Sequence, residues 1–216
     1  MTSITGEKSN IERIKMKNAA IVLAGGQGTR YGQQKQFIVL NGKPLWQHVH
    51  DKVSKFVDEG DVCVVGVDIE GGATRSQSVI NGLRYLKSRG EEYSRLIILE
   101  AARPLITDQQ IQDILDDDHP SCTFVLPLKS TVIMKDGTYL DRNQMWKMST
   151  PVAFDFKKFY DAYVSGKYLD FTDDTRVMFE EYGVKPHFLR GGENLLKLTY
   201  QSDLPVLESL MKRFSL

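Results

Sequence analysis

A glycine-rich segment followed by two basic side chains carries most of the chemical information in this sequence. Residues 19–32 read Ala-Ala-Ile-Val-Leu-Ala-Gly-Gly-Gln-Gly-Thr-Arg-Tyr-Gly, and Lys35 follows. An apolar run that breaks into glycines indicates a buried strand and then a loop whose backbone approaches a ligand closely. Arg30 and Lys35 indicate that this ligand is anionic, and we interpret it as a nucleoside triphosphate. A sharp turn that merely requires glycine is an equally good interpretation of such a segment taken alone.

Two common phosphate-binding fingerprints do not fit this segment. The dinucleotide pattern needs a third glycine three residues after Gly28, but Tyr31 stands there and the glycine comes one residue later. The P-loop pattern needs a lysine between a glycine and a Ser or Thr, but Lys35 lies between two glutamines. A phosphate-binding loop of another kind is therefore expected.

Apolar runs alternate with segments of helical periodicity along the chain. The pattern predicts strands at 19–24, 62–67, 96–99 and 123–128, and helices at 42–56, 71–86, 107–115, 156–163 and 172–182. Continuous apolar strands separated by amphipathic helices are typical of a mainly parallel sheet that is covered on both faces. We therefore expect a Rossmann-like α/β fold.

Ligands of such sheets bind at the carboxyl ends of the strands, and this rule groups the polar residues. The residues that follow a predicted strand, or lie in the late run 195–199, are Arg30, Lys35, Arg75, Ser78, Glu100, Arg103 and Lys197. Each one alone is more simply explained as a loop charge, a turn partner or a solvated side chain. Together they predict one polar cleft.

Composition and charge limit the possible partners. The 28 Lys and Arg residues balance the 28 Asp and Glu residues, so no overall basic field is available to hold nucleic acid. Cys63 and Cys122 both lie in apolar runs, which favours buried thiols in a reducing compartment. No run approaches the ~20 apolar residues of a membrane span. We expect a cytoplasmic protein without nucleic-acid or membrane partners.

The domain organisation follows from the same patterns. Residues 1–17 are polar and are predicted to form a disordered N-terminal extension, and residues 18–216 are predicted to form a single domain. The histidines show no metal-ligand spacing and are interpreted as structural; they are His48, His50, His119 and His187.

An ordered set of motifs resembles the cytidylyltransferases that make 4-diphosphocytidyl-2-C-methyl-D-erythritol, and their close relatives that activate ribitol 5-phosphate. The similar segments, in family order, are Leu23-Ala-Gly-Gly-Gln-Gly-Thr-Arg-Tyr-Gly with Lys35-Gln-Phe37, Gly71-Gly-Ala-Thr-Arg-Ser-Gln-Ser-Val with Asn81-Gly-Leu83, Glu100-Ala-Ala-Arg-Pro104, Leu140-Asp-Arg-Asn-Gln-Met-Trp146, Thr150-Pro-Val-Ala-Phe154, Thr172-Asp-Asp174 and Lys197-Leu-Thr199. The resemblance covers nearly all of the chain from Asn18 to Met211. It implies a nucleotide-diphospho-sugar transferase-like fold with a small protruding β-arm.

The resemblance also implies roles for particular residues. Contacts with CTP are implied for Ala24, Gly25, Gly26, Gly28, Gly72, Ala73, Ser78 and Ala101. The catalytic cations around the triphosphate would be Arg30, Lys35 and Lys197. The polyol phosphate would be bound by Arg103, Thr131, Arg142 and Thr172. Glu100 stands where the family's aspartate binds Mg²⁺, and residues 131–149 would form an arm that reaches into the partner subunit of a homodimer.

The predicted function is transfer of CMP from CTP to a polyol phosphate, with release of pyrophosphate. We expect 2-C-methyl-D-erythritol 4-phosphate as the acceptor, and keep ribitol 5-phosphate or another polyol or sugar phosphate for a surface polymer as the alternative. A non-catalytic nucleotide-binding module is a third possibility. Departures from the family pattern include Gln34 in place of Pro, Leu99-Glu100 in place of His-Asp, and a connection of only three residues, 68–70, before Gly71. These departures affect the acceptor more than the nucleotide chemistry.

Overall fold

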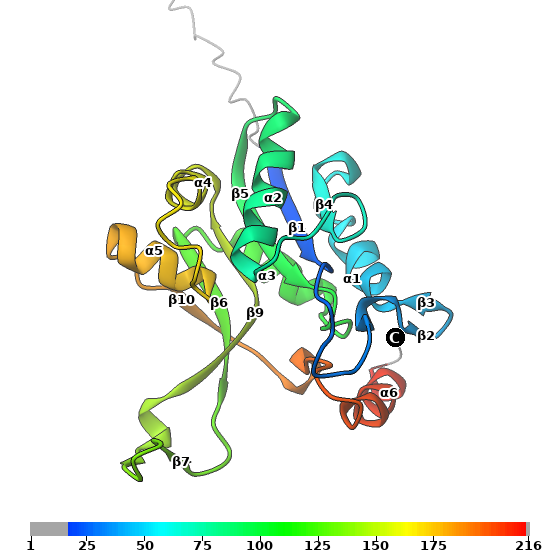
Figure 1. Cartoon of the computed structure of the whole chain (residues 1–216), viewed down its shortest axis with the longest axis vertical. Helices are drawn as coiled ribbons and strands as arrows, with labels where there is room; N and C mark the ends of the chain where they lie inside the picture. Colours follow the sequence, from blue (N-terminus) through cyan, green and yellow to red (C-terminus); the bar gives the residue numbers. More distant parts are fainter. Residues whose placement is uncertain (1–16, 215–216) are drawn as a thin grey trace, which may run out of the picture.

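A computed structural model describes residues 17–214 of the chain. Its main sheet has six strands in the order β10–β6–β9–β5–β1–β4 (Figure 1). These strands are β1 (Lys17–Leu23), β4 (Val62–Val65), β5 (Tyr93–Glu100), β6 (Ser121–Pro127), β9 (Trp146–Asp155) and β10 (His187–Arg190). The disordered extension expected over residues 1–17 lies outside the described residues, except for Lys17, which begins β1.

The sheet is mainly parallel, which confirms the predicted fold class. β1 runs parallel to β4 and β5, and β10 runs parallel to β6, whereas β9 is antiparallel to both of its neighbours. The sequence did not predict β9 or β10. The strand β9 was missed because its first residues are exposed and because it contains Pro151, a residue type that usually argues against a central strand.

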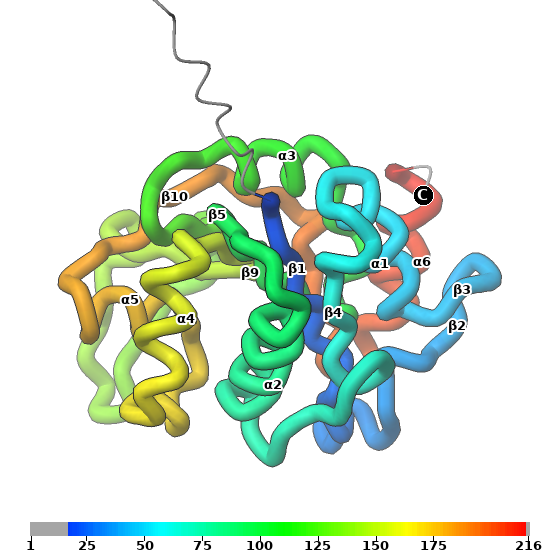
Figure 2. The backbone as a smooth tube through the Cα atoms, turned by 90° about the horizontal axis from the view of Figure 1, so that it is seen from above, coloured from blue at the N-terminus to red at the C-terminus, as the bar shows by residue number. Residues whose placement is uncertain are grey.

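Helices cover both faces of this sheet (Figure 2). They are α1 (Leu45–Val53), α2 (Arg75–Ser88), α3 (Asp108–Asp116), α4 (Phe156–Val164) and α5 (Asp174–Tyr182). The last helix, α6 (Asp203–Arg213), packs instead against Tyr31, Leu45 and Leu198. Ala19 and Ile21 of β1 belong to the core shared with α2, α4 and α5, while the alternate residues Ala20 and Val22 belong to the core shared with α1 and α3. Each fully buried large aliphatic side chain contributes about 1.5–3 kcal/mol.

Local sequence signals explain where several helices begin and end. Thr107 caps α3 in a capping box with Gln110, at the residue where the predicted helix begins. Gly183, at φ 66°, ends α5 in the left-handed conformation that glycine favours. The helix predicted over 42–56 is shorter, because residues 43–44 pair as β3 (Lys43–Pro44) with β2 (Val39–Leu40) before α1 begins.

A thin arm extends from the far ends of β6 and β9 (Figure 1). It carries the short hairpin of β7 (Val132–Ile133) and β8 (Tyr139–Leu140). The large apolar side chains Ile133, Met134 and Tyr139 are all exposed on it. The protruding arm over residues 131–149 is therefore present, and its role in dimerisation stays a prediction.

Short 3-10 helices complete the described chain. They are η1 (Lys35–Phe37), η2 (Glu59–Asp61), η3 (Arg142–Gln144) and η4 (Glu193–Leu195). Cys63 and Cys122 are free and buried, as expected. Within residues 17–214, none of the helices has the length and apolar character needed to span a membrane. The cytoplasmic location stays a prediction.

Candidate functional site

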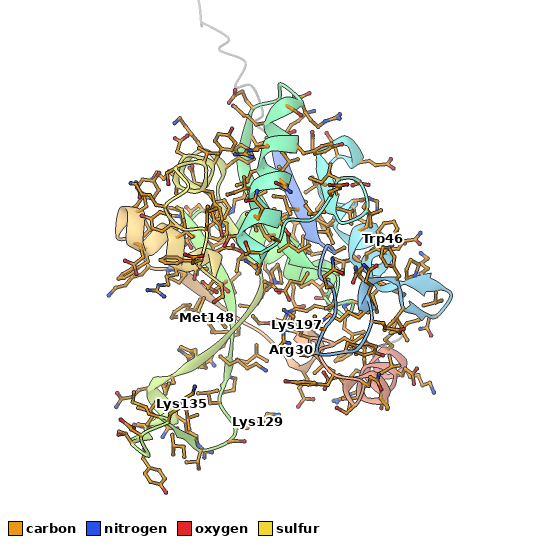
Figure 3. All side chains as sticks on the ribbon, viewed as in Figure 1. Arg30, Trp46, Lys129, Lys135, Met148 and Lys197 are labelled. Carbon is orange, nitrogen blue, oxygen red and sulfur yellow. The ribbon has the colours of Figure 1, made fainter. Side chains whose placement is uncertain are left out.

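Most of the predicted site residues line one cavity at the carboxyl ends of β1 and β5. The cavity measures about 340 Å³. Its predicted lining residues are Ala24, Gly25, Gly26, Gly28, Arg30, Lys35, Gly72, Ala73, Ser78, Glu100, Ala101 and Lys197. Figure 3 shows Arg30 and Lys197 at this place, between the sheet and α6. Residues from four separate parts of the sequence are thus brought together, and we refer to this cavity as the nucleotide cleft.

The glycine loop owes its shape to two positions where a side chain would not fit. Gly28 has φ +67°, and a Cβ built on it would lie 1.8 Å from the carbonyl oxygen of Gln33. A Cβ on Gly25 would lie 2.9 Å from Cα of Gly71, where the loop passes the entry to α2. Glycine at these positions lets the loop turn back sharply and leaves its backbone exposed to the cleft.

Lys35 lies at the start of η1, where the loop ends. Burial lowers the pKa of its ammonium group, and the positive charges of Lys197 and Arg30 lower it further. Glu100 acts in the opposite direction, but more weakly. Three cations therefore converge on a partly buried space, which is favourable only when an anion occupies it.

Glu100 is a negative charge that pairs with one of these three cations, Lys197, and with two arginines. Its carboxylate lies 2.5 Å from Nζ of Lys197, and 3.8 Å from Nε of both Arg75 and Arg103. Burial alone would raise the pKa of the Glu100 carboxyl, but the charges of Lys197, Arg103 and Arg75 outweigh this effect and hold the pKa below its usual range. Glu100 is therefore ionised, and its carboxylate lies among three side-chain cations.

These surroundings do not fit a magnesium ion held by Glu100. Magnesium needs near-octahedral oxygen ligands at ~2.1 Å, but nitrogen cations surround the carboxylate, and Lys197 is in direct contact with it. Among the described residues lining the nucleotide cleft, Glu100 is also the sole carboxylate. The predicted metal role of Glu100 stays a prediction, which this geometry does not favour.

Ser78 lies in the first turn and a half of α2 and holds the loop beside it. Its hydroxyl donates a hydrogen bond to the carbonyl oxygen of Thr74 at 3.1 Å, and it accepts one from the backbone N–H of Gly72 at 3.0 Å. A serine hydroxyl has one proton and two lone pairs. One acceptor position of Ser78 is therefore left for a ligand, while its donor is already used.

A second cavity adjoins the nucleotide cleft and shares Arg75 and Glu100 with it. It measures about 110 Å³ and contains the predicted acceptor residues Arg103 and Thr172. Arg103 donates to Oγ1 of Thr150 at 2.8 Å and to the carbonyl oxygen of Leu195. We refer to this cavity as the acceptor pocket.

The other two predicted acceptor residues lie elsewhere in this chain. Thr131 and Arg142 belong to the arm and line neither the nucleotide cleft nor the acceptor pocket. Arg142 donates to the carbonyl oxygen of Lys129, which Figure 3 places on the arm with Lys135. The fold therefore separates these two residues from the remaining site residues of the same chain.

The sequence did not reveal a buried ion pair in the lining of the acceptor pocket. Arg75 Nη1 lies 2.6 Å from Oδ2 of Asp174, and the hydroxyl of Tyr163 donates to Oδ1 of Asp174 at 2.5 Å. Asp174 is almost completely buried, and opposite charges raise the pKa of Arg75 in spite of its burial. The pair ties α2 to α5 and holds Arg75 next to Glu100. The Thr172-Asp-Asp174 motif was the one signal that could have indicated it.

Known proteins resemble this chain over most of its length. The family model for 2-C-methyl-D-erythritol 4-phosphate cytidylyltransferase matches residues 61–213, and a model for the MobA-like NTP transferase domain matches residues 20–81. A 2-C-methyl-D-erythritol 4-phosphate cytidylyltransferase of Clostridium novyi is 31% identical, with 91% of this chain and 97% of that protein covered. A ribitol-5-phosphate cytidylyltransferase of Lacticaseibacillus paracasei is 25% identical, with 89% and 97% covered. The crystal structure of 4-diphosphocytidyl-2C-methyl-D-erythritol synthase from Anaerococcus prevotii shares the fold, with a TM-score of 0.75, 22% identity, and 92% and 97% of the two chains covered.

Proposed function

The chain belongs to the 2-C-methyl-D-erythritol 4-phosphate cytidylyltransferase family and is a CTP-dependent nucleotidyltransferase, and we propose that it transfers CMP from CTP to 2-C-methyl-D-erythritol 4-phosphate. The observation that carries the proposal is the convergence of Arg30, Lys35 and Lys197 in one cavity, next to a smaller one lined by Arg103. A triphosphate needs the three cations of the larger cavity, and the phosphate of the acceptor needs Arg103 in the smaller one.

The reaction is an in-line displacement at phosphorus. An oxygen of the acceptor's phosphate attacks the α-phosphorus of CTP, the bond from that phosphorus to the bridging oxygen breaks, and pyrophosphate leaves with the bonding electrons. Negative charge spreads over the phosphate oxygens in the transition state, where fixed cations stabilise it better than mobile water does. Arg30, Lys35 and Lys197 supply these cations in our proposal.

A phosphate monoester does not need a protein base for this step. Its second pKa is near 6, so it is already a dianion at neutral pH. This agrees with the lining of the nucleotide cleft and the acceptor pocket, to which the described part of the chain contributes no histidine or cysteine. Arg103 and Thr172 would hold the acceptor phosphate while it attacks.

Selection of the base follows from the hydrogen bonds of Ser78. Because its only proton is given to Thr74, Ser78 can accept but not donate toward the base. Cytosine offers an amino group at the position where uracil offers a carbonyl oxygen. We therefore infer that Ser78, with the backbone of Gly72 and Ala73, favours CTP over UTP.

We further propose that magnesium enters with the triphosphate instead of being held by Glu100. Phosphate oxygens and water provide the oxygen ligands that this ion prefers, and the ion would neutralise part of the phosphate charge. The proposal also includes a homodimer, in which Thr131 and Arg142 on the arm contact the acceptor in the partner subunit. The exposed apolar side chains of the arm support this interpretation.

A pyrophosphate-release assay of CTP against separate acceptors tests the proposal. The acceptors are 2-C-methyl-D-erythritol 4-phosphate, ribitol 5-phosphate and a sugar 1-phosphate, with an acceptor-free control. Ribitol 5-phosphate is included because one relative carries that name. The highest kcat/KM is expected with 2-C-methyl-D-erythritol 4-phosphate. Preference for ribitol 5-phosphate would reassign the acceptor, and binding of CTP without turnover on any of them would favour a non-catalytic nucleotide-binding module.

A further inference from the structure

Two histidines that are far apart in the sequence stack against each other at the edge of the sheet. His119 precedes β6, and His187 begins the edge strand β10, opposite Cys122 of β6. Their ring centroids lie 4.1 Å apart with an interplanar angle of 18°. Since β6 and β10 start here and run toward the nucleotide-binding edge, the pair lies at the amino ends of these strands, away from the nucleotide cleft. These histidines show no ligand spacing along the chain, because only the pairing of β6 with β10 brings them together.

Asp117 lies between the two imidazole rings and the protein interior. Its Oδ1 is 3.1 Å from Nδ1 of His119, and its Oδ2 is 2.5 Å from Nδ1 of His187. The side chain of Asp117 is only 6% exposed, whereas those of His119 and His187 are 53% and 42% exposed. The carboxylate is therefore fixed from the protein side, while the rings face solvent.

The three nitrogen and oxygen atoms form a compact donor set. All of them lie within 4.8 Å of one another. A tetrahedral ion with ligand bonds of ~2.0–2.1 Å needs its ligand atoms about 3.3 Å apart. The Nδ1 atoms of His119 and His187 lie 3.1 Å and 2.5 Å from the oxygens of Asp117, so small movements of the two rings would reach the spacing that the ion needs.

We propose that Asp117, His119 and His187 bind a divalent transition-metal ion of the zinc type, with water completing the coordination. Imidazole nitrogen and carboxylate oxygen are ligands that zinc accepts, and three protein ligands with one open position is a known zinc arrangement. On binding, each imidazole presents an unprotonated Nδ1 to the metal, and the proton that it shared with Asp117 is released to solvent or moves to Nε2.

The donor set has charged groups of both signs beside it. Arg95 lies 3.7 Å from Oδ1 of Asp117 and donates to the carbonyl oxygen of His119 at 2.6 Å, so it orients the carboxylate and the loop from the interior. Asp118, which is 99% exposed and 3.7 Å from His119, adds a second negative charge on the solvent side. Outer contacts of this kind fix the orientation of metal ligands.

A metal at this site would join the loop after α3 to the first residue of β10. Beyond β10 the chain continues through η4 to Lys197, which lies in the nucleotide cleft. The metal would therefore hold the first residue of the segment that leads to this lysine. The expected effect is on stability, because a ligand that binds only the folded state shifts unfolding to higher temperature. Turnover of CTP does not depend on this site in our proposal.

Zinc titration of the untagged full-length protein tests the proposal. Calorimetry is expected to give one zinc per chain, and Co²⁺ is expected to give the visible absorption of a tetrahedral site. His119→Ala and His187→Ala should each weaken zinc binding about tenfold or more and remove the zinc-dependent rise in Tm. His50→Ala is the matched control. His50 also lies beside a carboxylate, with its Nδ1 3.7 Å from Asp51, but its neighbouring ring is Trp46, with the ring centroids 6.0 Å apart, and not a second histidine.

Each outcome decides the question. Equal zinc affinity of the wild type, His119→Ala and His187→Ala would overturn the proposal. The absence of any calorimetric or Co²⁺ signal in the wild type would also overturn it, and the two histidines would then be only a hydrogen-bonded pair. Circular dichroism of the variants without metal shows whether they are folded. If either one is not, Asp117→Asn, which keeps the shape of the side chain, is used with the same expected loss.

Discussion

Nζ of Lys197 lies 2.5 Å from Oε2 of Glu100, and this contact fixes the late segment of the chain to the end of the central strand β5. Arg75 and Arg103 approach the same carboxylate to 3.8 Å from two other elements. One buried negative charge thus holds three cations at the boundary between the nucleotide cleft and the acceptor pocket. Glu100 is accordingly interpreted as the residue that positions these cations.

Glu100→Gln is expected to lower kcat by about 10²-fold, the size of effect that small misplacements in an active site produce. The amide keeps the shape of the side chain but releases Lys197 and Arg103 from their fixed positions. Steady-state kinetics at a series of magnesium concentrations provide the measurement. The half-saturating magnesium concentration should stay as in the wild type, because the ion enters with the triphosphate. A marked rise in that concentration would instead identify Glu100 as a metal ligand.

The same substitution should change the dependence of stability on pH. Because the pKa of Glu100 is lower in the folded chain than the ~4.3 of an unfolded one, its charge stabilises the fold fully above about pH 4.3. That stabilisation is lost as the pH falls through the lowered value. Urea unfolding should therefore show Glu100→Gln about 1–3 kcal/mol less stable at pH 7, with the difference shrinking in acid. A difference independent of pH would show that Glu100 is not ionised.

Arg30→Ala and Lys35→Ala are expected to lower kcat by about 10²–10³-fold, as removal of one fixed transition-state donor does. Lys43→Ala is the control, because Lys43 is half exposed, pairs with Asp51 at 2.5 Å and does not line the nucleotide cleft. Rapid-quench or steady-state measurements with saturating CTP separate a loss of turnover from a loss of binding. Turnover near that of the wild type in a folded variant would remove the residue from the proposed mechanism.

The sequence predicted the parts of the site that are local and missed the parts that depend on pairing. The glycine loop and the helix entry at Ser78 are recognisable because backbone requirements select particular residues over short spans. The strand β9 and the pair Arg75–Asp174 were not recognised, since both depend on distant segments that meet only in the folded chain. The cation cluster at Glu100 lies between these cases: its members were predicted from the ends of the strands, but their distances from Glu100 are set only in the folded chain.

Ser78→Ala is expected to reduce the preference for CTP over UTP by about tenfold. The hydroxyl provides an acceptor for an amino group and anchors Gly72 at 3.0 Å, and a site that pairs buried polar groups rejects analogues that leave them unpaired. The ratio of kcat/KM for the two triphosphates is the measurement. Ser88→Ala is the control, as Ser88 ends the same helix on the exposed side. An unchanged ratio in Ser78→Ala would assign base selection to the backbone alone.

Complementation between two variants tests whether the arm acts in the partner subunit, and this test does not require a structure of the dimer. Arg142 lies on the arm of one chain, whereas Arg30 lines the nucleotide cleft. If the arm acts in the partner subunit, Arg30→Ala and Arg142→Ala dimers are each impaired at both sites. Mixing them gives a hybrid with one doubly impaired and one intact site, so random exchange should restore about a quarter of wild-type activity. The mixture is measured after exchange under mild urea, with each variant treated alone as the control. Activity that stays at the level of the separate variants, although size-exclusion chromatography shows exchanged dimers, would mean that Arg142 does not serve the partner's site.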